Sequence, residues 1–62
     1  MPIVHIDVLD GRTVEEKREM VKQVTDAIVN SLNVPPDAVT VIINDMPHHN
    51  FAKAGVLRSD RK

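Results

Sequence analysis

The sequence predicts a small α+β domain built as a single β-α-β unit. Three observations lead to this prediction: an alternating apolar segment at residues 2–9, an amphipathic helical segment at 14–32, and a second apolar segment at 39–46. Because a long helix between two strands forms a crossover connection, we expect the strands to be parallel and the crossover to be right-handed. A chain of 62 residues holds one domain, 1–62, since it has no room for a second core.

The first strand is predicted over 2–9, where even-numbered residues are apolar and odd-numbered residues are polar in the middle. This alternation is typical of a strand that buries one face and leaves the other partly covered. Asp10 and Gly11 then form a turn, because glycine readily adopts a positive φ. The residues of the buried face are Pro2, Val4, Ile6 and Val8.

The helix is predicted to begin at Val14 and to end at Leu32. Thr13 and Glu16 have the spacing of a capping box, in which each side chain bonds the backbone N–H of the other residue. Asn33 suits a left-handed C-terminal cap, and the prolines at 35–36 cannot continue a helix. One apolar stripe recurs at three- and four-residue steps, formed by Met20, Val21, Val24, Ala27, Ile28 and Leu32.

The second strand is predicted over 39–46, and we expect 51–57 to form a small hairpin or arm around Gly55. Two parallel strands under one helix leave one sheet face uncovered and both sheet edges unpaired. A core of this size supplies little stability, and the chain contains no cysteine for a disulfide. We therefore expect self-association, in which two units pair into a four-stranded sheet. The sequence does not specify the number of copies.

Composition excludes several classes of function. The formal net charge of −1 lacks the basic excess of a protein that binds nucleic acid or an anionic membrane. Phe51 is the single aromatic residue, so stacked bases or sugars have no platform. The absence of cysteine excludes thiolate chemistry. No segment has the pattern of a membrane span or a signal peptide, so we expect a cytoplasmic location.

Few residues are candidates for chemistry. His5 and Asp7 share a strand face, but a half-exposed polar strip is the preferred interpretation. Asp45, His48 and His49 suggest a metal site, yet adjacent strand residues point to opposite sides and no third-ligand motif is present, so we interpret them as a solvated loop. The two glycines are too far apart for a phosphate-binding loop. We expect no metal and no cofactor.

Pro2 follows Met1 directly, and a small second residue permits removal of the initiator methionine. Removal would give Pro2 a free secondary amine. An α-amino group titrates at about 7.7–8.0 in solvent, near the range where a general base is most effective. An apolar pocket or a nearby arginine would favour the neutral amine, and the ring would fix the direction of its lone pair. On position alone, a role as the first residue of an edge strand is equally consistent.

An ordered set of short motifs resembles the 4-oxalocrotonate tautomerase family over nearly the whole chain. The resemblance implies a β-α-β protomer, a dimer with a four-stranded sheet, and a homohexamer built as a trimer of dimers. It also implies an isomerase of aromatic-compound catabolism that needs no cofactor and takes a small enol or keto acid as substrate. The motifs are Met-Pro-Ile at the start, Leu9-Asp10-Gly11-Arg12-Thr13, Glu16-Lys17, residues 41–46 (VIINDM), and Phe51 ahead of Gly55.

The resemblance also implies roles for particular residues. In that family the amino-terminal proline is the acid/base, which takes a proton from a dienol hydroxyl and returns it to a distant carbon. Pro2 matches this catalytic residue, and Arg12 matches an arginine of a neighbouring subunit that holds a substrate carboxylate. Phe51 matches a pocket wall that excludes water. Leu9 and Thr40 fall at further substrate-binding positions.

Thr40 departs from the family pattern, because it stands where the family typically has a second arginine. A hydroxyl donates one hydrogen bond but carries no charge. A substrate with two carboxylates would be bound best by two cationic side chains. Three alternatives follow. The substrate is a monocarboxylate enol acid, the reaction is a promiscuous enolisation, or Lys53, Arg58 or Arg61 of another subunit replaces the missing charge.

Two other functions stay open at this point. Addition of water or another nucleophile to an unsaturated or halogenated acid would need a water-activating group, for which Asp45, His48 and His49 are the candidates. A non-enzymatic self-associating module would leave Pro2 incidental. Retention of Met1 would favour the module, because an amide nitrogen has no usable basicity.

Overall fold

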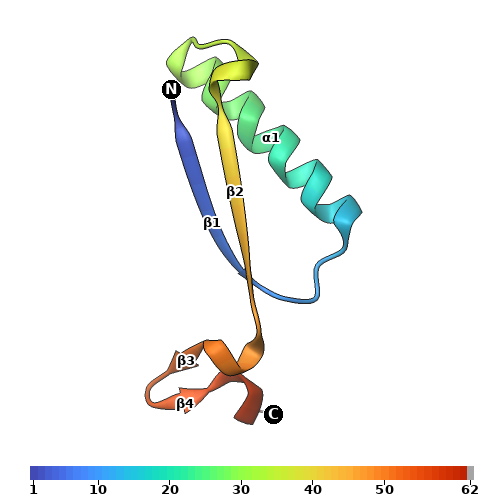
Figure 1. Cartoon of the computed structure of the whole chain (residues 1–62), viewed down its shortest axis with the longest axis vertical. Helices are drawn as coiled ribbons and strands as arrows, with labels where there is room; N and C mark the ends of the chain where they lie inside the picture. Colours follow the sequence, from blue (N-terminus) through green and yellow to red (C-terminus); the bar gives the residue numbers. More distant parts are fainter. Residues whose placement is uncertain (62) are drawn as a thin grey trace.

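The chain runs as strand, helix and strand, followed by a short hairpin (Figure 1). A computed structural model describes residues 1–61. The β-α-β unit consists of β1 (Ile3–Leu9), α1 (Val14–Leu32) and β2 (Thr40–Met46), with a 3₁₀ turn at Pro36–Ala38 between α1 and β2. The predicted order of elements is confirmed.

β1 and β2 pair in parallel, as predicted. Their register runs from Ile3 opposite Thr40 to Leu9 opposite Met46. The pairing extends past β1, where the Asp10 N–H donates a hydrogen bond to the Met46 carbonyl at 2.9 Å. Because partnered residues of parallel strands share a face, each face of the sheet combines residues from both strands.

Each strand begins one residue later than predicted. Pro2 stands outside β1 because its ring nitrogen has no hydrogen to donate to the ladder, although its carbonyl accepts from the Thr40 N–H at 3.0 Å. Val39 stands outside β2 because its N–H donates to the Pro36 carbonyl at 3.1 Å and closes the 3₁₀ turn. Each difference therefore follows from one backbone nitrogen, which has no hydrogen in Pro2 and donates its hydrogen within the turn in Val39.

Helix α1 has the predicted bounds, and both of its predicted caps are confirmed. Thr13 and Glu16 form the capping box. Asn33 adopts the left-handed conformation with φ 56°, and its N–H donates to the Val29 carbonyl at 2.9 Å. No helix in the described part of the chain is long and apolar enough to cross a membrane.

Helix α1 covers one face of the two-stranded sheet only partly. The even-numbered side of β1 is half-buried, but no side chain within residues 1–61 is fully buried. The prediction of a continuous buried face is therefore wrong for the single chain, because one helix is too narrow to enclose it. Ala27 and Leu32, assigned to the buried helical stripe, are also exposed.

The C-terminal hairpin lies beyond the end of β2, away from α1 (Figure 1). A 3₁₀ turn at His48–Asn50 leads into antiparallel strands β3 (Ala52–Lys53) and β4 (Val56–Leu57). Ala54 and Gly55, with φ 53° and 78°, form the two-residue connection, and two positive φ angles are the signature of a type I′ turn. A last 3₁₀ turn follows at Arg58–Asp60.

The protomer is an open shape rather than a sphere. Its extents are 43 × 23 × 13 Å and its radius of gyration is 14.8 Å. A compact domain of this length would have a radius of gyration of about 10–11 Å. Large apolar side chains also remain on the surface, including Ile3 at 52% and Ile42 at 45% exposure.

Candidate active site

Pro2 and Thr40 lie together at one end of the sheet. Pro2 is half-buried, and its carbonyl accepts the hydrogen bond from the Thr40 N–H. This bond holds the Pro2 carbonyl in the sheet pattern, while the ring nitrogen takes no part in the ladder. Met1 precedes it and is 91% exposed. The Pro2 carbonyl is thus held in the sheet, whereas the Pro2 nitrogen lies at the start of the strand, next to the exposed Met1.

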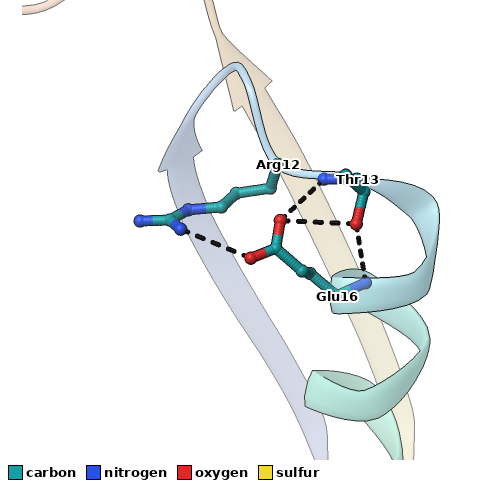
Figure 2. A network of polar contacts seen from close by, with 3 residues as sticks. All are labelled: Arg12, Thr13 and Glu16. Carbon is teal, nitrogen blue, oxygen red and sulfur yellow. Dashed lines mark hydrogen bonds and ion pairs between the residues drawn. The ribbon is translucent and has the colours of Figure 1, made fainter.

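Arg12 lies past the opposite end of β1, in the turn that leads to α1. Its side chain is 68% exposed, and its Nη1 is 3.5 Å from Glu16 Oε2 (Figure 2). Glu16 Oε1 accepts hydrogen bonds from the Thr13 N–H at 2.9 Å and from the Thr13 hydroxyl at 3.3 Å. The Glu16 N–H donates in return to Thr13 Oγ1 at 3.1 Å. The capping box therefore also orients the guanidinium of Arg12.

Glu16 stays ionised to lower pH than an isolated glutamate. The backbone hydrogen bond from Thr13 lowers the pKa of Glu16 below its usual 4.5, desolvation opposes this effect, and the charge of Arg12 lowers the pKa further. A lowered pKa in the folded state stabilises the fold above the unfolded-state pKa. That stabilisation is lost as the pH falls through the folded-state pKa.

Replacing Glu16 with glutamine is expected to flatten the acid limb of the stability curve. Glutamine still accepts the bond of the capping box, but it carries no charge to titrate. Wild type and Glu16→Gln should differ in Tm at neutral pH and converge as the pH falls through the lowered pKa of Glu16, where the glutamate becomes protonated. Glu19→Gln, on the same helix but outside its first turn, is the matched control. If the difference in Tm between wild type and Glu16→Gln were the same at every pH, the ionised Glu16 would not be the source of the stabilisation.

Leu9 and Phe51 line one cavity of about 250 Å³ between the end of β1 and the hairpin. Leu9 is half-buried, and Phe51 is 36% exposed. The basic residues of this cavity were expected to reach a site only from another subunit, whereas in the structure they share the cavity with Leu9 and Phe51 of the same chain. The other lining residues are Lys53, Val56, Arg58 and Arg61.

The two halves of the predicted site do not meet within one chain. Pro2 and Thr40 lie at one end of β1, whereas Arg12, Leu9 and the hairpin lie at or beyond the other end (Figure 1). The strand between them has seven residues, a span of about 20 Å. A small acid cannot touch both ends of one protomer.

Two of the three side chains considered for metal binding or water activation, Asp45 and His48, have other partners. His48 Nδ1 lies 2.7 Å from Asp10 Oδ1, and Lys17 forms an ion pair with Asp45. Asp7 Oδ1, which shares a strand face with His5, accepts from Asn44 Nδ2 at 3.1 Å. Within residues 1–61, no three His, Asp or Glu side chains are grouped to hold a metal ion.

The family of the chain is shown by its match along nearly its whole length. Residues 2–61 match the family described as "Tautomerase enzyme". The chain belongs to the tautomerase family. A probable tautomerase of Streptococcus pneumoniae is 46% identical over 59 residues, which are 95% of this chain and 98% of that protein. The resemblance found in the sequence is thus confirmed, and membership of this family supports an isomerase activity.

Two further members of the tautomerase family are similar to this chain. The 2-hydroxymuconate tautomerase of Pseudomonas sp. strain CF600 is 40% identical over 55 residues, which are 89% of this chain and 87% of that enzyme. The heterohexameric 4-oxalocrotonate tautomerase of Chloroflexus aurantiacus J-10-fl superposes with a TM-score of 0.92 at 26% identity, covering 100% of both chains. The similarity in fold therefore includes the hairpin as well as the β-α-β unit.

Proposed function

We propose that this tautomerase-family chain is a cofactor-free keto–enol tautomerase that converts a 2-hydroxydienoate, or a related enol acid, to its 2-oxo isomer. Pro2 is the general acid/base, and Arg12 holds a substrate carboxylate. The observation that carries the proposal is the placement of Pro2, whose carbonyl is bonded to Thr40 while its nitrogen stays outside the ladder. The similarity to a 2-hydroxymuconate tautomerase supports the class of substrate.

The reaction moves one proton and leaves the atoms of the substrate otherwise unchanged. Neutral Pro2 nitrogen takes the proton of the 2-hydroxyl, and the O–H electron pair forms the new C=O bond. The double bonds shift along the chain, and the distant carbon takes the proton back from the Pro2 ammonium. Removal of the exposed Met1 is required, because it converts an amide nitrogen into a basic secondary amine.

Arg12 contributes charge where negative charge builds up. Its guanidinium meets a carboxylate with two parallel hydrogen bonds and keeps its charge at neutral pH. A carboxylate held in this way draws electron density from the dienolate. Leu9 and Phe51, at the same end of the protomer, supply an apolar wall that keeps water from the conjugated chain.

The proposed site is completed by association of copies. Two β-α-β units pair into a four-stranded sheet, and three such dimers form a homohexamer. The open protomer, the exposed Ile3 and Ile42, and the lack of a fully buried side chain within residues 1–61 support association. The heterohexameric relative supports the number. In such an assembly Pro2 of one chain meets Arg12 of another, which a single chain keeps apart.

A removable extension before Pro2 tests the function. The protein is purified with a short N-terminal extension and assayed before and after a protease leaves Pro2 as the first residue. The readout is the ultraviolet absorbance of 2-hydroxymuconate and of phenylenolpyruvate. We expect turnover only after cleavage, because only then is the Pro2 amine free, and intact mass verifies the new terminus. Equal rates before and after cleavage, or no turnover of either enol acid after it, would overturn the proposal.

A further inference from the structure

We propose that the cavity beneath the hairpin is an anion-binding subsite in which Arg58, assisted by Lys53, takes the second carboxylate of a dianionic substrate. The proposal rests on the tautomerase function above, because it places that carboxylate at the far end of the acid that Arg12 holds. It assigns Arg58 and Lys53 a role in specificity. Thr40, next to Pro2, brings a hydroxyl and no charge to the other end of the sheet.

The cavity concentrates positive charge in a chain that is negative overall. Residues 51–62 contain four of the eight basic residues and only one of the nine acidic residues, Asp60, so this segment carries a formal charge of +3 against −1 for the whole chain. Three of these cations, Lys53, Arg58 and Arg61, line the same cavity. Like charges gathered at a concave site repel one another and attract an anion.

The ion pairs of the described residues involve other cations. Within residues 1–61, Arg12, Lys17 and Arg18 have acidic partners. Lys53, Arg58 and Arg61 form no such pair within this part of the chain, so their charges are not neutralised there. An incoming carboxylate would therefore displace no acidic side chain among the described residues.

Arg58 is the best-placed of the three cations. Its backbone N–H donates to the Phe51 carbonyl at 2.7 Å, which fixes Arg58 beside the aromatic wall. The guanidinium of Arg61 already makes one hydrogen bond within the protein, since its Nη2 donates to the Lys53 carbonyl at 2.9 Å. The guanidinium of Arg58 makes no hydrogen bond to another described residue, so its whole fork is available for a carboxylate.

The size and lining of the cavity suit one end of a small diacid. Complete ligand pockets commonly have volumes of about 300–1,000 Å³, and this cavity has about 250 Å³. Leu9, Phe51 and Val56 form its apolar part, which suits a hydrocarbon chain, and the cations form its polar part. The arrangement fits a carboxylate at the end of an unsaturated chain rather than a whole cofactor.

Muconate and sorbate provide a matched pair of probes. Both are six-carbon dienes, but sorbate has a methyl group where muconate has its second carboxylate, and neither has a hydroxyl to tautomerise. Calorimetric titration of the assembled, processed protein measures both affinities. We expect muconate to bind at least about tenfold more tightly than sorbate, the effect of one charge-assisted contact.

The Arg58→Gln variant should lose this preference, so that its muconate-to-sorbate affinity ratio falls by about tenfold and its sorbate affinity stays the same. Arg58→Lys keeps the charge without the fork and should retain part of the ratio. Arg18→Gln, an exposed cation on α1, should retain all of it. Circular dichroism and the mass of the assembly show that each variant folds. An unchanged ratio in folded Arg58→Gln would overturn the subsite.

The binding measurement separates this proposal from the proposed function. If the affinity for muconate depends on Arg58 but no enol acid is turned over, the subsite is supported and the tautomerase function is refuted. If enol acids are turned over and the muconate-to-sorbate affinity ratio is the same in wild type and Arg58→Gln, the function is supported and the subsite is refuted. Equal affinity of wild type for muconate and sorbate would likewise refute the subsite.

Discussion

Replacing Pro2 with alanine is expected to lower kcat by about 10²–10⁴-fold, the usual contribution of a positioned general acid/base. Alanine also permits removal of Met1, so the variant keeps an amino terminus but loses the ring that directs the lone pair. KM should change little, because Arg12 still holds the carboxylate in both proteins. The initial rate with 2-hydroxymuconate, followed by ultraviolet absorbance, measures the effect.

His5→Gln is the control for the loss of Pro2. His5 is an exposed residue of β1, three positions along the chain from Pro2. It is the only histidine of β1, and histidine is a common general base in enzymes. We expect His5→Gln to retain the wild-type kcat. Similar rates for wild type and Pro2→Ala would remove Pro2 from the mechanism, and a large loss in His5→Gln alone would assign the base to the histidine.

Replacing Arg12 with glutamine is expected to lower kcat/KM for enol acids by about 10–150-fold. This range corresponds to the loss of a charge-assisted hydrogen bond worth about 1.5–3 kcal/mol. Arg12→Lys keeps the charge but loses the bidentate contact with the carboxylate. Its kcat/KM should therefore lie between the values of wild type and Arg12→Gln. Arg18→Gln, a nearby exposed arginine paired with Glu15, serves as the control and should match wild type.

Mixed assemblies test whether Arg12 acts across a subunit boundary. Pro2→Ala and Arg12→Gln chains, each expected to be at least about tenfold less active than wild type, are co-expressed in equal amounts. If every site combines Pro2 of one chain with Arg12 of another, about one quarter of the sites contain both native residues, and the mixture recovers about one quarter of the wild-type rate. If both residues act from the same chain, no site is complete and the rate of the mixture stays at the average of the two variants measured alone.

Local sequence is sufficient for the elements of this tautomerase-family protein. The bounds of α1 follow from Thr13, Glu16 and Asn33, whose side-chain or backbone bonds reach only three or four residues along the chain. The parallel strands follow from the length of the helix between them. The contact of Arg12 with Glu16 is also local, because the two residues are only four positions apart in the sequence.

Tertiary structure alone decided which surfaces are covered and which distant side chains meet. The contact of His48 with Asp10 joins residues separated by β2 and α1, and no spacing rule predicts it. The alternation of apolar residues in β1 predicted which face of the strand is the more buried one. The degree of burial of this face depends on how much of the sheet one helix can cover. The three cations of the hairpin cavity are visible in the sequence as a basic segment. They become a candidate site only because the Ala54–Gly55 turn folds them back beside Leu9 and Phe51.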